Sequence, residues 1–424
     1  MTSFVVDGGR SLQGHIKPAG NKNAALPMVA AALLTDEPVR LKNVPDIKDV
    51  HTLTELLGAL GVSAEWTGEG EVTIHAKDLR SAAIDPALTA SIRASILLAG
   101  PMLARSSELK LPPPGGDVIG RRRLDTHFDA LRVLGAEVEV GDEFVLRGKL
   151  HGAEIFLDEP SVTATENVIM AATLAEGTTV VRNAAAEPHV RDLCNMLVGM
   201  GARISGIGGN VIEIEGVDSL SGTTAEVGPD YIEVGSFIGL AAVTRSELTI
   251  GDVEPNDLTS MRIMFERLGV TCELQGRTLR VPADQSLEIR MDLGQQIPKI
   301  DDGPWPQFPA DLVAIALVVA TQCRGTILIH EKMFESRMFF SDKLTAMGAR
   351  IVLCDPHRAV VVGPAPLTGS VVESPDIRAG MAILIAALGA HGRSEIHNIG
   401  QIERGYERID ERLRALGAEI QRVE

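Results

Sequence analysis

Residues 112–127 read PPPGGDVIGRRRLDTH and combine residue types that suit a site for a small anion. Three consecutive arginines, Arg121–Arg123, follow a Gly-Gly pair, and an acidic residue, Asp117, stands between the glycines and the arginines. Guanidinium groups bind carboxylates and phosphates through paired hydrogen bonds, and adjacent glycines let a backbone approach a ligand closely. The segment therefore predicts a loop that holds a small oxyanion beside one carboxyl group.

An internal repeat predicts the elements that must position this loop. A helix that ends in Leu-Gly or Met-Gly, followed by an alternating strand, occurs six times. The copies are LGVSAEW (60–66), LGAEVEV (134–140), MGARISGI (200–207), LGVTCEL (268–274), MGARIVL (347–353) and LGAEIQRV (416–423). The glycine suits the left-handed conformation that ends many helices, and the alternation is typical of a half-buried strand. Six α/β units are expected.

A short strand precedes each copy, and its distance from the glycine shows where the repeat is interrupted. The strands are PVRLKNVP (38–45), SELKLPPP (107–114), GTTVVRNA (177–184), SELTIGDV (246–253), GTILIHEK (325–332) and SEIHNIGQ (394–401). The separation is 26 residues in the second unit, from Leu109 to Gly135, and 20 or 21 in the other five. The extra residues lie in the 112–127 loop, and insertions into a repeat map to loops that often carry function.

Apolar helical runs lie between the motifs, such as NAALPMVAAALL (23–34), ENVIMAATLA (166–175) and AILIAALGA (382–390). They are apolar on nearly every side, which predicts helices buried on several faces. A chain of 424 residues is too long for one core, and its length allows two or three domains. The repeat favours an α/β protein of two domains with three units each, helices inside and sheets outside.

The composition narrows the classes of function. A net charge of −17 and only 3% aromatic residues argue against nucleic acid and membrane surfaces as partners. The four cysteines show neither C-x-x-C nor zinc-ligand spacing and are expected to be reduced thiols. The N-terminus has no signal-peptide pattern, and no apolar stretch reaches the roughly 20 residues of a membrane span. A soluble, cytoplasmic protein is expected.

Ten motifs in order along the chain resemble the enolpyruvyl transferases. They are GNKNAALP (20–27), SIRASILLAGP (91–101), PPGGDVIGRRRLDTH (113–127), PSVTATENVIMAA (160–172), NAAAEPHVRDL (183–193), PDYIEVGSF (229–237), PQFPADL (306–312), FESRM (334–338), DIRAG (376–380) and IERGYERI (402–409). The resemblance implies a two-domain inside-out α/β barrel of six βαβαββ-type units, three per domain. It assigns 1–21 plus 232–424 to a catalytic domain and 22–231 to a second domain carrying the loop, with the active site in the cleft.

Members of this family move the enolpyruvyl group of phosphoenolpyruvate (PEP) onto a hydroxyl and release phosphate. GNKNAAL and PGGDVIG resemble the sugar-nucleotide branch more than the shikimate-pathway branch. The resemblance therefore implies transfer to the 3-hydroxyl of UDP-N-acetylglucosamine, the first committed step of peptidoglycan synthesis. It implies no metal, no organic cofactor and only small-molecule partners, namely PEP and a UDP-sugar. A monomer or weak homo-oligomer is expected.

PEP carries a carboxylate and a phosphate, so its site needs cations. Six basic residues match family positions that bind PEP: Lys22, Arg93, Arg122, Arg337, Arg378 and Arg404. Lys22 and Arg404 also match catalytic positions. A lone arginine is usually a surface ion-pair partner, but matches at five separate arginines favour the functional interpretation of that set. A lysine before an apolar helix is usually solvated, but the place of Lys22 at the predicted domain crossing favours a functional role. Arg121 and Arg123 retain the alternative of a solvated face.

Two aspartates match the acid and the base of the reaction. Asp117 stands where many members have a cysteine that protonates the PEP methylene and is alkylated by fosfomycin; some resistant members have aspartate. A closed, dry site would favour the neutral acid, whereas adjacent arginines would oppose it. Asp311, in FPADL, matches the base for the sugar hydroxyl, with a helix N-cap as the alternative or additional role. Asp376 is placed to orient Arg378 through a charged hydrogen bond.

The acceptor positions match less closely than the PEP positions. Family positions for the UDP-sugar correspond to Asn23, Arg93, Arg122, Arg123, Leu124, Asp125, Ser161, Val162, Thr163 and Asp311. Thr163 replaces a glycine that lets the backbone approach the diphosphate; its side chain either blocks that approach or adds a hydrogen bond. Arg123-Leu124 replaces Pro-Val, and Tyr231 replaces a common arginine.

These departures keep two alternatives open. The first is a paralogue of the enzyme that uses another uridine nucleotide or sugar as acceptor in a specialised pathway, and the residue at 163 favours it. The second is a non-catalytic sensor of a nucleotide sugar, which the acids at 117 and 311 argue against. Turnover separates the enzymes from the sensor, and the identity of the product separates the two enzymes.

Overall fold

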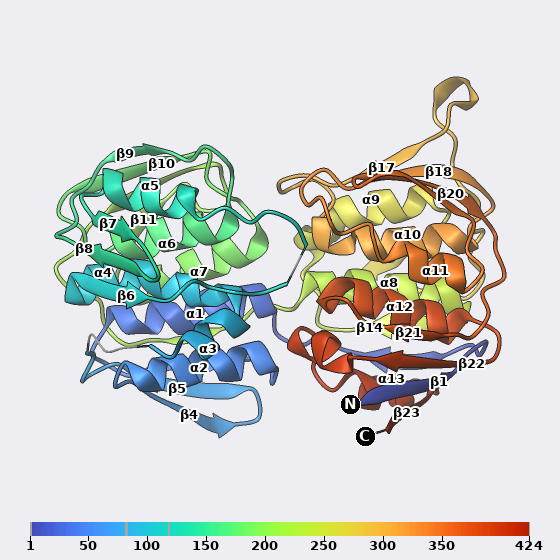
Figure 1. The fold of residues 1–424 in the computed structure, drawn as a ribbon, viewed down its shortest axis with the longest axis horizontal. Helices are drawn as coiled ribbons and strands as arrows, with labels where there is room; N and C mark the ends of the chain where they lie inside the picture. The colour runs from blue at the N-terminus through green and yellow to red at the C-terminus, as the bar shows by residue number, and fades with distance from the viewer. Residues whose placement is uncertain (1, 81–83, 118, 424) are drawn as a thin grey trace. The chain divides into compact units, whose positions relative to one another are not determined.

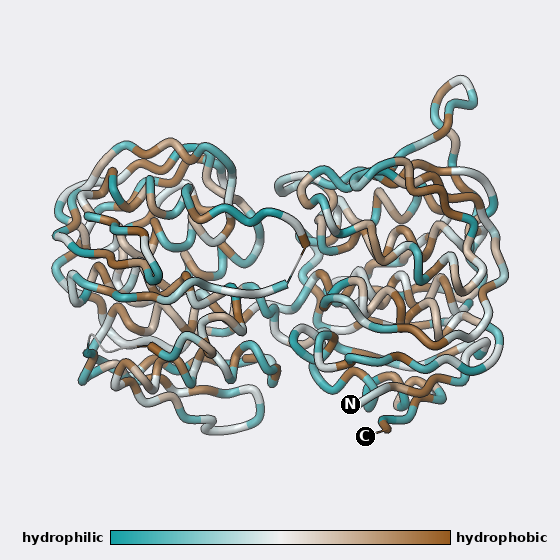
Figure 2. Tube along the Cα trace, in the orientation of Figure 1, coloured by the Kyte–Doolittle hydropathy of each residue, from teal (hydrophilic) through white to brown (hydrophobic). Residues whose placement is uncertain are grey.

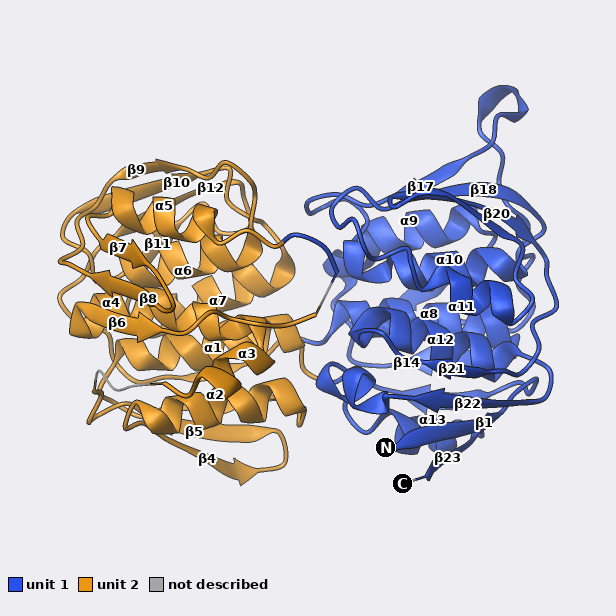
Figure 3. Cartoon of the chain, in the orientation of Figure 1, with its two compact units in different colours: residues 1–19, 118–121, 229–424 blue, residues 20–117, 122–228 orange. Residues whose placement is uncertain are grey.

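The computed structural model describes residues 2–80, 84–117 and 119–423 and divides the chain into two compact units (Figure 3). Unit 1 comprises residues 1–19, 118–121 and 229–424, and unit 2 comprises 20–117 and 122–228. The expected crossings, 21/22 and 231/232, fall two and three residues later than those of the structure. Within the 112–127 loop, Val118 lies outside the described residues.

The tip of this loop belongs to unit 1, whereas the sequence assigned the whole loop to the other domain. The reason is a pair of hydrogen bonds within unit 1. Ser336 N donates to Ile119 O at 3.1 Å, and Arg121 N donates to Glu335 Oε2 at 3.2 Å. The loop therefore contributes residues to both units.

Unit 2 contains three sheets and the helices that cover them (Figure 1). Its helices are α1 (Lys22–Ala31), η1 (Ala32–Leu34), α2 (Lys48–Ala59), α3 (Pro86–Ser91), η2 (Arg93–Leu98), α4 (Ala99–Ser106), α5 (Asp125–Val133), α6 (Val162–Ala172) and α7 (Pro188–Gly199). Its strands are β3 (Val39–Lys42), β4 (Ser63–Gly68), β5 (Glu71–His75), β6 (Glu108–Leu111), β7 (Glu137–Val140), β8 (Phe144–Arg147), β9 (Glu154–Phe156), β10 (Thr178–Arg182), β11 (Arg203–Ser205), β12 (Val211–Glu215) and β13 (Thr224–Glu226).

Unit 1 contains three further sheets. Its helices are α8 (Tyr231–Thr244), η3 (Pro255–Leu258), α9 (Thr259–Arg267), η4 (Leu293–Gln295), η5 (Ala310–Leu312), α10 (Val313–Gln322), α11 (Ser341–Ala346), α12 (Ile377–Gly389), η6 (Ile399–Arg404) and α13 (Ile409–Ala415). Its strands are β1 (Ser3–Asp7), β2 (Gln13–Ile16), β14 (Glu247–Ile250), β15 (Glu273–Gln275), β16 (Thr278–Val281), β17 (Lys299–Asp301), β18 (Gly325–His330), β19 (Ile351–Asp355), β20 (Arg358–Gly363), β21 (Val371–Glu373), β22 (Arg393–His397) and β23 (Glu419–Val423).

The repeated motifs form the predicted elements. Each of the six sheets contains one of the predicted strand pairs, and the glycine between helix and strand has a positive φ every time. These glycines are Gly61, Gly135, Gly201, Gly269, Gly348 and Gly417, with φ from 73° to 107°. Five sheets have four strands, of which one neighbouring pair is parallel, and the β6-β8-β7 sheet has three. The predicted α/β class, with mixed sheets, is confirmed.

The apolar runs form helices buried on every side, as predicted. All residues of α8 are buried, and so are all but the last residue of α10 and of α12. These three helices pack against one another inside unit 1, with β17, β18 and β20 on one side and β14, β21 and β22 on the other (Figure 1). Figure 2 shows apolar residues along the inner helices and hydrophilic residues in many connecting loops. Removal of this apolar surface from water is the main stabilisation of each core.

Candidate active site

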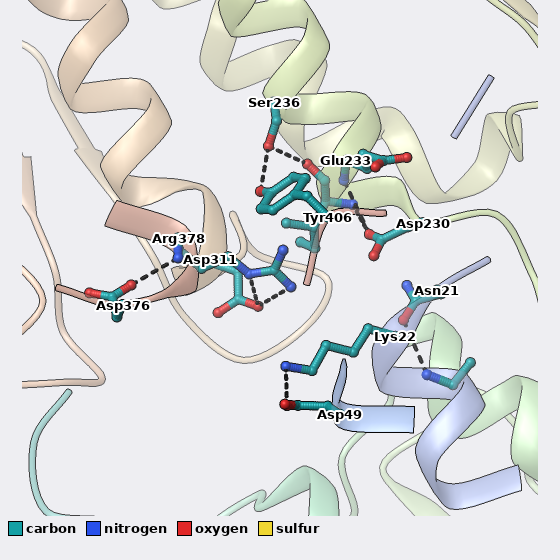
Figure 4. Close-up of polar contacts among 12 residues, drawn as sticks. Asn21, Lys22, Asp49, Asp230, Glu233, Ser236, Asp311, Asp376, Arg378 and Tyr406 are labelled. Atoms are coloured by element: carbon teal, nitrogen blue, oxygen red, sulfur yellow. Dashed lines mark hydrogen bonds and ion pairs between the residues drawn. The ribbon is translucent and has the colours of Figure 1, made fainter. Parts of the chain in front are cut away.

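The first candidate cation, Lys22, begins α1 in unit 2. Asn21 caps this helix, since its Oδ1 accepts a hydrogen bond from Ala24 N at 3.1 Å. The Lys22 Nζ atom lies 2.7 Å from Asp49 Oδ2, and the two side chains are 10% and 5% exposed (Figure 4). The solvated interpretation of Lys22 is therefore wrong. Asn23, the next residue along α1, is half-buried.

Arg93 and Arg122 lie close together in unit 2. Arg93 opens η2, and its Nη2 donates to the backbone oxygens of Arg122 at 2.8 Å and Arg123 at 3.0 Å. Burial, followed by the charge of Arg122, lowers the pKa of Arg93 to about 10. Two guanidinium groups in a half-buried setting repel each other, and a bound anion would relieve that repulsion.

Gly116 allows the loop to lie against both arginines. A Cβ atom at this position would lie 2.8 Å from Arg93 Cβ and 3.4 Å from Arg122 Nη1, and the φ of Gly116 is +111°. Any side chain would therefore clash with Arg93 and strain the backbone. Asp117, the predicted acid, is the next residue and is half-buried.

The neighbouring residues Arg123, Leu124 and Asp125 have structural partners of their own. Arg123 forms ion pairs with Asp158 at 2.7 Å and with Asp125 at 3.3 Å. The hydrogen bonds that Arg123 donates to Asp158 and, to a smaller extent, to Asp125 raise the pKa of Arg123. Leu124 precedes α5 and packs against the core of unit 2, and Arg121 is exposed. The solvated interpretation therefore fits Arg121, whereas Arg123 is occupied by two carboxylates.

Thr163 is bonded to a buried histidine whose tautomer the surrounding contacts determine. Gly100 N donates to Asn167 Oδ1 at 2.8 Å, which identifies the other amide atom as the donor. That Nδ2 donates to Ile96 O at 2.9 Å and reaches His127 Nδ1 at 3.0 Å. The His127 proton therefore lies on Nε2, which donates to Thr163 Oγ1 at 3.1 Å. Because Oγ1 accepts this bond, the Thr163 hydroxyl hydrogen can point elsewhere.

His127 remains uncharged in this position. Burial, followed by the charge of Arg93, lowers the pKa of His127 to about 3. Thr163, the partner of His127, lies in helix α6. This helix begins at Val162 and is capped by Ser161, whose Oγ accepts a hydrogen bond from Ala164 N at 3.4 Å. The positions expected to bind the acceptor diphosphate thus form the N-terminal turn of α6, where backbone N–H groups suit an anion.

In unit 1, Asp311 lies between two arginines. Its Oδ1 accepts from Arg337 Nη2 at 2.6 Å. Its Oδ2 accepts from Arg378 Nε at 3.0 Å (Figure 4). Burial alone would raise the pKa of Asp311, but the charges of Arg378 and Arg337 outweigh it and hold the pKa well below its usual value. Asp311 does not cap a helix, because it lies within η5 and α10 follows without a side-chain cap.

Arg378 is held by several elements of unit 1. Asp376 caps α12 and accepts from the backbone N–H groups of Arg378 at 2.8 Å and Ala379 at 2.9 Å. This bond between Asp376 and Arg378 is made by the backbone N–H, whereas the sequence predicted a charged hydrogen bond that orients the guanidinium. The Arg378 guanidinium lies 5.4 Å from the ring centre of Tyr406, whose hydroxyl bonds Ser236 Oγ at 2.9 Å.

The remaining predicted residues of unit 1 lie on separate elements. Arg404 ends η6 and donates from Nη1 to Gln401 Oε1 at 3.0 Å. Tyr231 begins α8, is buried, and packs edge-on against Trp305 with ring centres 5.6 Å apart. Asp230, the N-cap of α8, has its pKa raised to about 6 by burial, against the opposing charge of Arg378.

Sequence reasoning missed the partners of the predicted residues. Asp49, His127, Asn167 and Tyr406 hold Lys22, Thr163 and Arg378 in place, yet no role was assigned to them. Asn167 offered a usable signal, since it is polar inside the apolar run 166–175.

Within the described ranges, no three His, Cys, Asp or Glu side chains are arranged to hold a metal ion. No described helix has both the length and the apolar character to cross a bilayer.

Comparisons with known proteins identify the family. The EPSP synthase (3-phosphoshikimate 1-carboxyvinyltransferase) family profile matches residues 6–413. A UDP-N-acetylglucosamine 1-carboxyvinyltransferase from Bradyrhizobium diazoefficiens is 60% identical over 421 residues, which cover 99% of this chain and 98% of that protein. A protein of the same name from Treponema denticola is 57% identical over 422 residues, 99% of each chain.

Two solved structures share the fold. An enolpyruvyl transferase from Streptomyces tendae has a TM-score of 0.88 at 24% identity, covering 100% of this chain and 99% of that one. The EPSP synthase of Acinetobacter baumannii has a TM-score of 0.76 at 19% identity, covering 100% of both chains. With the sequence matches over nearly the whole length, these findings show that the chain belongs to the EPSP synthase family and groups within it with the UDP-N-acetylglucosamine 1-carboxyvinyltransferases.

Proposed function

We propose that this chain transfers the enolpyruvyl group of PEP to the 3-hydroxyl of UDP-N-acetylglucosamine and releases phosphate. The observation that carries the proposal is the full-length similarity to proteins named for this reaction. The half-buried guanidinium pair of Arg93 and Arg122 supports it, because two neighbouring guanidinium groups suit the binding of an oxyanion. The reaction is the first committed step of peptidoglycan synthesis.

The cations are proposed to bind the two anionic groups of PEP. In unit 2 these are Lys22, Arg93 and Arg122, and in unit 1 they are Arg337, Arg378 and Arg404. The Arg337 Nε is buried and has no hydrogen-bond partner among the described residues, so it is a donor available to an oxyanion. Lys22 and Arg404 are also proposed to stabilise the charge that develops as the tetrahedral adduct forms.

Asp311 is proposed as the base that takes the proton of the sugar hydroxyl. A carboxylate held by two arginines is a weak base, because the charges that keep it ionised also stabilise it against protonation. We therefore propose that substrate binding draws Arg378 away from Asp311 and onto PEP, which strengthens Asp311 as a base, while Arg337 stays bonded to Asp311 through Nη2. Asp117 is proposed to protonate the PEP methylene.

Phosphate release from PEP with UDP-N-acetylglucosamine, followed by mass spectrometry of the nucleotide, tests the proposal. The expected product is heavier than the acceptor by one enolpyruvyl group. Phosphate release without a heavier nucleotide would contradict the transfer. No release, with PEP still protecting the protein from heat, would move the proposal to another acceptor, and a panel of uridine nucleotides would then be tested.

A different acceptor is the second candidate, and the contact between Thr163 and His127 favours it. The threonine side chain occupies the N-terminal turn of α6, where the family has glycine, and the buried histidine fixes its hydroxyl. A uridine nucleotide or sugar with a different group at this point would fit such a turn. Comparison of kcat/KM across the panel distinguishes the candidates, since the preferred acceptor has the highest value.

The finer features of the architecture also remain proposals. We propose that the six sheets and their helices are six copies of one βαβαββ-type unit, three per domain, in an inside-out α/β barrel arrangement. The proposed assembly is a monomer or weak homo-oligomer in the cytoplasm. Light scattering of the purified protein at several concentrations tests the assembly.

A further inference from the structure

Asp302 and Glu331 form a buried pair of carboxyl groups in unit 1, close enough to the predicted residue Arg337 for its charge to act on Glu331. Both residues are 0% exposed. Lys332 N donates to Asp302 Oδ1 at 2.5 Å, and Met333 N and Phe334 N donate to Glu331 Oε1 at 3.1 Å each. Asp302 Oδ2 and Glu331 Oε2 receive no hydrogen bond from any donor in the described residues.

One shared proton would satisfy both remaining oxygens. The Glu331 carboxyl lies within hydrogen-bonding reach of Asp302, and two adjacent buried carboxylates cannot both be ionised. Burial is the main cause that raises the pKa of Glu331 to about 9; Asp302 adds to it, and the charge of Arg337 opposes it. A protonated Glu331 Oε2 can donate to Asp302 Oδ2, and one proton then serves both remaining oxygens.

The pair also holds the backbone that leads to the candidate base. Glu331 Oε1 bonds the N–H groups of Met333 and Phe334. The ring of Phe334 lies 4.9 Å from the Arg337 guanidinium, which in turn bonds Asp311 at 2.6 Å. A continuous series of contacts therefore runs from the acid pair to Asp311.

We propose that Asp302 and Glu331 are positioning residues, which share one proton and hold the turn that fixes Arg337 against Asp311. The inference rests on the proposed function of Asp311 and deepens it. Arg337 is the cation that acts on Glu331, and His357 Nδ1 lies 2.7 Å from the Glu331 backbone oxygen. Asp301, His330 and Lys332 adjoin the pair in sequence; Lys299 and Lys332 bond Asp301, and the charge of Arg358 acts on His330.

Glu331→Gln is the informative variant. Its amide can donate to Asp302 at every pH and still accept from the two backbone N–H groups, so the turn stays in place. We expect activity within about threefold of wild type at pH 7.5. Above pH 9 the wild-type pair loses its proton and kcat falls, whereas the decline is weaker in Glu331→Gln. Glu331→Ala removes the bonds and is expected to lower kcat at least tenfold. Glu373→Gln, at an exposed acid of β21, is the matched control.

A second readout does not depend on activity. The pKa of Glu331 is raised in the folded chain, so its stabilising contribution is complete below the unfolded value of about 4.3 and is lost as pH rises through about 9. Between about pH 4.3 and pH 9, the equilibrium constant for unfolding of wild type should rise relative to that of Glu331→Gln, by up to about tenfold per pH unit. Trp305 fluorescence in a Trp66→Phe background reports unfolding of unit 1.

The two readouts separate the failure of this inference from failure of the proposed function. Parallel pH curves for wild type and Glu331→Gln, in both activity and stability, would overturn the shared proton. Full activity of Glu331→Ala would overturn the positioning role. If wild type turns over no acceptor, the proposed function fails, and the stability comparison alone still decides whether the proton is shared.

Discussion

Replacement of Asp311 by asparagine tests the electrostatic centre of unit 1. The carboxylate is 24% exposed and bonds two arginines, at 2.6 and 3.0 Å. With charge centres about 4 Å apart and an effective dielectric constant of about 20, each arginine attracts it by roughly 4 kcal/mol before desolvation is subtracted. Removing one partner of a buried ion pair costs about 3–5 kcal/mol. Because the site is partly exposed and an amide keeps some hydrogen bonds, we expect Asp311→Asn to destabilise unit 1 by about 2 kcal/mol.

The same change should lower kcat by roughly 10²–10⁴-fold if Asp311 is the base. Urea unfolding would be followed by Trp305 in a Trp66→Phe background, since the chain has two tryptophans and Trp66 lies in unit 2. Asp342→Asn, at an exposed acid of α11, is the control.

The difference in unfolding free energy between wild type and Asp311→Asn should shrink at low pH. The folded pKa of Asp311 is depressed, so its stabilisation is present above the unfolded value of about 3.9 and is lost as the pH falls below it. The gap between wild type and variant should therefore narrow below pH 4. A variant as stable as wild type within about 0.5 kcal/mol would refute the electrostatic argument, and activity above a tenth of wild type would refute the role as base.

Three further predictions concern the loop and the acceptor turn. Fosfomycin should add no mass to the wild-type protein, whereas Asp117→Cys should gain one fosfomycin per chain; a wild-type adduct at Asp117 would contradict this. Thr163→Gly should weaken UDP-N-acetylglucosamine binding, measured by calorimetry, roughly five- to tenfold, because about 1 kcal/mol of hydrogen bonding is lost. Thr163→Ser, the control, should bind like wild type. Tighter binding by the glycine variant would show that the threonine side chain obstructs the site. Protease cleavage near Gly115–Gly116 should slow several-fold when PEP and acceptor are both present, and equal rates would exclude ligand-induced ordering of the loop.

The repeated elements were predictable because each carries a local signal. A glycine after a helix specifies the left-handed turn at Gly61 or Gly417, and alternating residues specify the strand that follows. A helix that is apolar on every face must be buried on every face, because any exposed face would put apolar side chains in water. The interior position of α8, α10 and α12 therefore also follows from the sequence. The resemblance to a family then supplied the candidate site residues.

The partners of those residues were not predictable from one sequence. Asp49 lies 27 positions from Lys22, and Asp311 lies 67 positions from Arg378, so no periodic pattern connects them. The proton position on His127 depends on an amide contributed by another helix and held by Gly100. The resemblance to the family assigned the whole loop to the domain of residues 22–231, whereas two hydrogen bonds that join its tip to Ser336 and Glu335 group the tip with unit 1.

The N-terminal strand β1 lies between β22 and β23 in its sheet, pairing Phe4 with Ile396 and with Arg422. Ribosomes add about 5–20 residues per second, so this strand waits roughly 20–80 seconds for its partners to be synthesised. Unit 2 is complete in the nascent chain once residue 228 has emerged, while unit 1 still lacks residues 229–424, which supply strands to all three of its sheets. An unpaired strand edge is exposed during this interval, and such edges promote aggregation. Yield during expression should therefore depend on how the first seven residues are protected until synthesis ends.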